Sequence, residues 1–112
     1  MEHRDVFILE TIVEFCDKIA AVLFDEQATQ ESFIKDDRLQ DLCAFYVLQV
    51  GENARELSGT FINSHPEIEW HKIIGLRNLI AHEYGGIDSE YLWQILQKNI
   101  PEFKAFCVGI IK

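Results

Sequence analysis

The sequence predicts an all-α protein, an antiparallel bundle of four to five helices that forms one domain over residues 1–112. Two observations predict this class. Apolar residues recur at steps of three and four along almost the whole chain, and the strict alternation typical of half-exposed strands is absent. The chain has 112 residues, of which 48% are hydrophobic, so it can bury one modest core.

The first helix is expected over about residues 3–24, where apolar residues recur on one side and charged residues occupy the other. A polar connection follows, with a short helical turn expected at about residues 32–35. Asp36 or Asp37 then resembles an N-cap, because a short carboxylate can accept a hydrogen bond from a free N–H group of the first turn. The second long helix is expected to reach about Ser58, with Gly59 as its stop.

The second helix has more apolar surface than one packed side requires. On a helical wheel with a rotation of about 100° per residue, Phe45 and Leu48 lie well outside its main apolar stripe. A surface helix of a monomer needs only one apolar side. This helix is therefore either the centre of the bundle or part of a subunit interface, and in so short a chain the interface is the favoured interpretation.

The third helix is expected over about residues 68–84. Gly85-Gly86 follows it and would allow the helix to end in the left-handed conformation. Asp88 then resembles the N-cap of a fourth helix. At Pro101 the chain is expected to kink or to begin a new helix, because proline has no N–H group to donate.

Composition argues against several classes of protein. No apolar run approaches the roughly 20 residues of a membrane helix, and the N-terminus does not resemble a signal peptide, so a cytoplasmic location is expected. The formal net charge of −9 is unusual for a nucleic-acid-binding surface, although residues 65–82 hold three of the four histidines. Neither the histidines nor the cysteines have the spacing of metal ligands, so no metal or other cofactor is expected.

Polar side chains interrupt the third helix near its end. On a helical wheel Arg77 and Tyr84 lie almost in line within the apolar arc, where a buried guanidinium is costly unless it is paired or partly hydrated. Arg77 would therefore pair with a carboxylate of the bundle, such as Glu52, or face a cleft where it can bind an anion. His82 lies about 140° from Arg77, and Asn78 lies on the flank of His82.

Spacing alone leaves two interpretations of this group open. In the functional one, Arg77, Asn78, His82 and Tyr84 form a site at the helix C-terminus, because arginine can hold a phosphate with a fork of donors and histidine can transfer protons near neutral pH. In the structural one, His82 is favoured by the helix dipole, Tyr84 is a core residue and Arg77 forms an ion pair.

The pattern Arg-x4-His-x-Tyr over residues 77–84, at the end of a helix in a small all-α protein, resembles the HepT-like toxins of the HEPN superfamily. Three further segments are similar to that family: QVGENARELS (49–58), PEIEWHKIIGLRNLIAHEYGGIDSEYLWQIL (66–96) and NIPEF (99–103). The first 35 residues share only its helical character. The resemblance implies a HEPN-like bundle that dimerises.

The same resemblance implies a function and roles for single residues. Such proteins are metal-independent ribonucleases, usually toxins, in which two copies of the motif face one cleft of a homodimer. Carried over, Arg77 would bind the scissile phosphate of RNA, His82 would assist proton transfer, and Asn78 would position the substrate or the arginine. Glu52, the possible ion-pair partner of Arg77 on the helical wheel, is expected to support the site. The implied partner is a minimal nucleotidyltransferase antitoxin that adenylylates Tyr84. The alternative is a non-catalytic helical module that binds such a nucleotidyltransferase.

Overall fold

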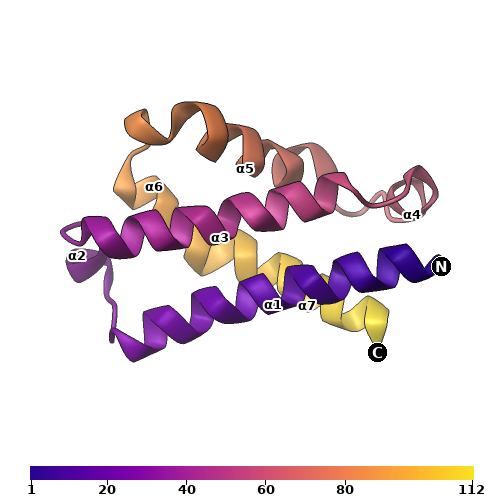
Figure 1. Cartoon of the computed structure of the whole chain (residues 1–112), viewed down its shortest axis with the longest axis horizontal. Helices are drawn as coiled ribbons and strands as arrows, with labels where there is room; N and C mark the ends of the chain where they lie inside the picture. The colour runs from indigo at the N-terminus through magenta and orange to yellow at the C-terminus, as the bar shows by residue number, and fades with distance from the viewer.

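The computed structural model describes all 112 residues and contains helices but no strand, which confirms the predicted all-α class. Long helices run alternately in opposite directions, and α1 and α3 lie side by side (Figure 1). In chain order the elements are α1 (His3–Asp25), α2 (Gln30–Phe33), α3 (Asp37–Arg55), α4 (Gly59–Asn63), α5 (Trp70–Glu83), the 3₁₀ turn η1 (Tyr84–Gly86), α6 (Ser89–Gln94), the π-helical turn η2 (Ile95–Asn99) and α7 (Ile100–Ile111).

The central element of the bundle is α3, which packs against both α1 and α5, while α1 also packs against α7. Leu48 is half-buried against the core, so part of the extra apolar surface predicted for this helix is used within the chain. Phe45 remains 52% exposed and Leu42 remains 38% exposed. The fold therefore accounts for Leu48 and leaves Phe45 and Leu42 on the outer face of α3.

Two predicted N-caps are confirmed by side-chain hydrogen bonds. An Asp36 carboxylate oxygen accepts a hydrogen bond from the backbone N–H of Leu39, with an N···O distance of 3.1 Å, at the start of α3. Asp88 accepts one from the N–H of Glu90, at 3.0 Å, before α6. These carboxylates also lie where the positive end of the helix dipole favours an anion.

The predicted end of the second helix at Ser58 is wrong. Helix α3 ends at Arg55, and Ser58 is the N-cap of α4, where its hydroxyl accepts a hydrogen bond from the N–H of Phe61 at 3.1 Å. The cause lies in α1: Asp5, which is only 2% exposed, accepts hydrogen bonds from the Ser58 N–H at 2.8 Å and from its hydroxyl at 2.7 Å. A carboxylate far away in sequence thus fixes the chain in a non-helical conformation at this point.

The expected left-handed end at Gly85-Gly86 is also wrong, because no glycine of the chain has a positive φ. Instead the last turn tightens into η1, and the N–H of Ile87 donates to the carbonyl of Tyr84 at 3.1 Å. Farther on, η2 joins α6 to α7 at the place where a kink or restart was expected. Pro101 stands at the start of α7 and has no N–H to offer to the preceding turn.

Buried apolar side chains from α1, α3, α5 and the C-terminal helices form one continuous core. Its members include all three cysteines, and burial raises the pKa of Cys16, Cys43 and Cys107 to about 12. These thiols are therefore small packing groups that ionise little near neutral pH. None of the helices combines the length and the apolar character needed to cross a membrane.

Candidate active site between α3 and α5

The backbone of α5 approaches α3 most closely at Arg77. A methyl group added to Gly51 would lie 2.7 Å from Arg77 Cβ and 2.8 Å from Arg77 N, well inside contact distance. Only a residue without a side chain fits between the two helices at this point. The backbone position of Arg77 is therefore fixed by the packing of α5 against Gly51, before any polar contact is considered.

The next residue of α3 holds the side chain of Arg77. Arg77 Nε donates to Glu52 Oε1 at 2.6 Å, and the Arg77 and Glu52 side chains are 25% and 37% exposed. Arg77 Nη1 donates to Asn78 Oδ1 at 3.0 Å. The same Glu52 oxygen lies 3.8 Å from Arg55 Nη1. This confirms the first of the two solutions predicted for Arg77, a pair with a bundle carboxylate.

The pairing leaves part of the guanidinium free. No acceptor within the chain is bonded to Arg77 Nη2, and the head group reaches the edge of the bundle rather than its dry interior. Because Glu52 and Asn78 restrict the rotation of the side chain, the remaining donors are held in one direction. Such a preoriented fork is suited to an anionic group such as a phosphate.

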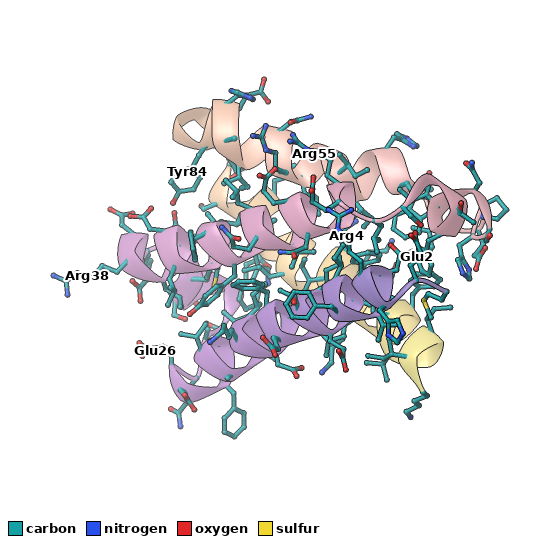
Figure 2. All side chains as sticks on the ribbon, turned by 45° about the vertical axis from the view of Figure 1, so that its right-hand side comes forward. Glu2, Arg4, Glu26, Arg38, Arg55 and Tyr84 are labelled. Atoms are coloured by element: carbon teal, nitrogen blue, oxygen red, sulfur yellow. The ribbon has the colours of Figure 1, made fainter.

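Tyr84 is also held by α3, at the opposite end of that helix. Its hydroxyl donates to Asp41 Oδ1, and in Figure 2 the side chain reaches from the end of α5 toward α3. Partial burial raises the pKa of the Tyr84 phenol above its ordinary value, and the hydrogen bond to Asp41 and the charges of Asp41 and Asp37 raise it further. Tyr84 is therefore a neutral hydrogen-bond donor at physiological pH.

His82 stands apart from both of these contacts. Its side chain is exposed and has no hydrogen bond or ion pair with any other residue. On an ideal helix it lies about 140° from Arg77. The turn η1 follows α5 directly, and no hydrogen bond connects His82 to Arg77. Within one chain, the structure brings Arg77, Asn78 and Glu52 together and leaves His82 free in solvent.

The predicted site omitted three residues that the structure places against it: Asp41, Gly51 and Arg55. A signal for Asp41 was present in the sequence. On a helix, residues eleven apart point in nearly the same direction, so Asp41 shares a side of α3 with Glu52. Once Glu52 is paired with Arg77, an antiparallel α3 and α5 must bring Asp41 toward Tyr84.

The electrostatic character of the site differs between its two ends. Around Glu52 the two guanidinium groups of Arg55 and Arg77 outnumber the carboxylate. Around Tyr84 the nearby charges are the carboxylates of Asp37 and Asp41. The chain contains no group of three or more His, Cys, Asp or Glu side chains arranged to hold a metal ion.

A cavity with a volume of about 660 Å³ lies elsewhere. It is lined by residues at the start of α1, around α4 and at the end of α7, among them Asp5, Ser58 and His65. Neither Arg77, His82 nor Tyr84 borders it. We place the candidate site at Arg77 on the basis of its preoriented donors. The absence of Arg77 from this cavity does not oppose that choice, because an open surface can become a cleft when another molecule covers it.

Comparison with known proteins gives relatives along nearly the whole chain. Residues 8–110 match the family Ribonuclease HepT-like. A protein of Methanocaldococcus jannaschii named "Putative RNase" is 29% identical over 105 residues, covering 93% of this chain and 94% of that protein. A "Probable ribonuclease HepT" of Thermococcus cleftensis is 29% identical over 102 residues, covering 91% and 89%. No solved structure matches the chain.

Proposed function

The chain belongs to the family of HepT-like ribonucleases, and on that premise we propose that it is a metal-independent endoribonuclease that acts as a toxin. The observation that carries the proposal is the fixed arginine. Gly51 sets its backbone, Glu52 and Asn78 hold its side chain, and its outer N–H groups have no partner in the chain. A group with this arrangement can stabilise the negative charge that develops on a phosphate during cleavage.

In the proposed reaction the ribose 2′-oxygen of RNA attacks the neighbouring phosphorus. The bond from phosphorus to the 5′-oxygen breaks, which leaves a 2′,3′-cyclic phosphate and a free 5′-hydroxyl. Arg77 binds the non-bridging oxygens, and His82 assists the transfer of the proton from the attacking 2′-hydroxyl to the departing 5′-oxygen. Asn78, which is bonded to Arg77, positions the guanidinium, and Glu52 supports it from α3.

We further propose that the active form is a homodimer with a composite site. Within one chain His82 does not lie close to Arg77, so in the dimer His82 of one copy would approach Arg77 of the other. Exposed apolar side chains support an interface on the outer face of α1 and α3, where Phe7, Leu42 and Phe45 are 68%, 38% and 52% exposed. On α3, Phe45 is within about 40° of both Asp41 and Glu52, so a partner seated there would border the site.

The proposed partner of the toxin is a minimal nucleotidyltransferase that adenylylates Tyr84. Tyr84 is half-buried at the end of the candidate site where α5 ends and η1 begins. A nucleotide on its hydroxyl would add bulk and negative charge close to Arg77 and would compete with RNA for the arginine. This modification would switch the ribonuclease off without unfolding it.

The ribonuclease is tested with purified protein that carries no modification on Tyr84. It should degrade RNA in the presence of EDTA, and Arg77→Ala and His82→Ala should each abolish cleavage. His71→Ala is the matched control, because His71 is an exposed histidine of the same helix and should leave the rate unchanged. RNA that stays intact with the unmodified wild-type dimer would refute the proposal.

The dimer is tested by sedimentation at fixed protein concentration. Phe45→Glu should dissociate the dimer and abolish RNA cleavage together. Phe24→Glu is the control, since Phe24 is more exposed, at 82%, but lies near the far end of α1. If Phe45→Glu remains dimeric, the interface lies elsewhere.

One observation favours the second candidate function, a binding module without catalysis. The net charge of −9 works against the long-range attraction of RNA. A pure binding module would retain growth inhibition and partner binding after Arg77→Ala and His82→Ala. Growth inhibition by these two variants therefore separates the candidates, because a ribonuclease toxin would lose it and a binding module would keep it.

A further inference from the structure

The hydroxyl of Tyr84 has one partner in the chain, a carboxylate of α3. It donates its proton to Asp41 Oδ1, and this contact connects the end of α5 to the first turns of α3, 43 residues earlier in the sequence. Asp41 itself is exposed on the helix surface and makes no ion pair. The carboxylate is therefore both directed at the phenol by geometry and open to solvent on its other side.

Nearby cations do not neutralise this carboxylate. Arg38, one turn before Asp41, extends away from the body of the molecule in Figure 2 and forms no ion pair. Asp37 adds a second negative charge close to the phenol. A phenol is neutral at pH 7, and burial and these carboxylates raise the pKa of Tyr84 still further above that pH. A neutral phenol is a weak nucleophile until a base takes its proton.

We propose that Asp41 is the general base for nucleotide transfer to Tyr84, so that the toxin supplies the base for its own modification. The inference rests on the proposed adenylylation of Tyr84 by a nucleotidyltransferase. As Tyr84 Oη attacks the α-phosphorus of a nucleoside triphosphate, the new Oη–P bond forms, the bond between the α-phosphorus and the bridging oxygen breaks, and pyrophosphate leaves. The phenol proton passes to Asp41 Oδ1, which already accepts it in a hydrogen bond.

The same contact gives the modification a mechanical consequence. A phosphodiester on Tyr84 Oη has no proton to donate, and its negative charge is repelled by Asp41 and Asp37. The modified side chain must therefore leave its place against α3. Apart from Arg38, which extends into solvent, the cationic groups along the same side of α3 are those around Glu52, where Arg77 has free donors. The movement would carry the nucleotide toward the arginine that it is proposed to block.

The test measures nucleotide transfer by intact mass, with full-length unmodified toxin, its partner nucleotidyltransferase and ATP. Asp41→Asn keeps an oxygen that can accept the hydrogen bond but cannot take a proton. It should lower kcat for transfer about 100-fold and change KM for the toxin by less than about twofold. Asp41→Glu restores a carboxylate and should recover at least about a tenth of the wild-type rate.

Asp37→Asn is the matched control, because it removes a neighbouring carboxylate charge and leaves the hydrogen bond to Tyr84 in place. It should transfer nucleotide within about threefold of the wild-type rate. An Asp41→Asn variant with unchanged kcat would overturn the assignment. So would equal losses of kcat in Asp41→Asn and Asp37→Asn, because charge rather than proton transfer would then be responsible.

A second measurement needs no nucleotidyltransferase and tests the contact by itself. The Tyr84 ring carbon next to the hydroxyl, followed by NMR as pH rises, should titrate at lower pH in Asp41→Asn than in the wild type. An unshifted titration would overturn the inference even if transfer is slowed. If the wild type takes up no nucleotide at all, the proposed modification fails, while a shifted titration would show that the Asp41 contact exists.

Discussion

The close approach at Gly51 makes Gly51→Ala the sharpest test of how the site is built. The added methyl carbon would lie 2.7, 2.8 and 3.1 Å from the Cβ, N and Cα atoms of Arg77, two of which belong to the backbone. Ordinary carbon contacts are about 3.5–4.0 Å, so the two helices must separate by about 1 Å. A long side chain could swing aside to relieve the overlap, but the backbone of a packed helix cannot.

The free-energy change has two parts of opposite sign. Forcing a methyl group into a packed contact costs about 1–3 kcal/mol, whereas alanine stabilises a helix interior by about 1 kcal/mol relative to glycine. The expected result is a net loss of about 1 kcal/mol, or about 4 °C in Tm. Gly75→Ala in α5 is the matched control, because no atom lies within 4 Å of its new methyl group. This control should gain about 1 kcal/mol from propensity alone.

Urea denaturation at equal protein concentration gives the comparison, with an expected difference of about 2 kcal/mol between the variants. The displacement also moves Arg77, and a shift of about 1 Å at a reacting group can lower a rate about 100-fold. The rate of RNA cleavage by Gly51→Ala should therefore fall about 100-fold under conditions in which the variant is still folded. If Gly51→Ala is stabilised as much as Gly75→Ala, the helices are not in contact at Arg77 and the account of the fixed arginine is wrong.

Three further predictions concern the scaffold. Asp5→Ala should destabilise the fold by about 1–3 kcal/mol in thermal unfolding, because it leaves the N–H and hydroxyl of Ser58 without their acceptor. Asp36→Ala should cost about 1 kcal/mol through loss of the α3 N-cap, and Asp36→Asn should retain most of that stability. The three buried cysteines should react with a thiol reagent at pH 8 only after denaturation, since burial raises each pKa to about 12; rapid labelling of the native protein would contradict that burial.

The sequence was informative about elements whose causes are local. Helical periodicity predicted the long helices, and the spacing of short carboxylates predicted the caps at Asp36 and Asp88, because these effects act within a few residues. The helix end at Ser58 could not be predicted in this way. It depends on Asp5, 53 residues earlier in the chain, and no local pattern indicates which carboxylate will accept from which N–H group.

The candidate site shows the same division. The conflict between Arg77 and its apolar arc was visible on a helical wheel, and Glu52 was a correct choice of partner. The wheel overestimated the burial of Arg77, because its long side chain reaches the edge of the bundle and stays 25% exposed. It also failed at Gly85-Gly86, where the chain tightens into a 3₁₀ turn with negative φ. Glycine permits a left-handed conformation but does not require it.

Helix register explains why these particular polar residues lie where they do. Asp41 and Glu52 are eleven residues apart on α3, about 16.5 Å along its axis, while Tyr84 and Arg77 are seven apart on the antiparallel helix, about 10.5 Å. The difference of about 6 Å is within the reach of the long Arg77, Glu52 and Tyr84 side chains, which lean along the helices to meet their partners. Both ends of the motif are thus fixed by the register of α3 against α5.

The register also separates the motif into two kinds of residue. Arg77 and Tyr84 each have a carboxylate partner on α3, so a shift of α5 by one residue would break both contacts at once. His82 has no partner in its own chain, and the register does not constrain the direction in which it points. A residue that stabilises the fold would be expected to contact other residues of its own chain. The register therefore leaves His82 in solvent, as it leaves His71, and only a change of RNA cleavage in His82→Ala but not in His71→Ala would assign His82 to the proposed composite site.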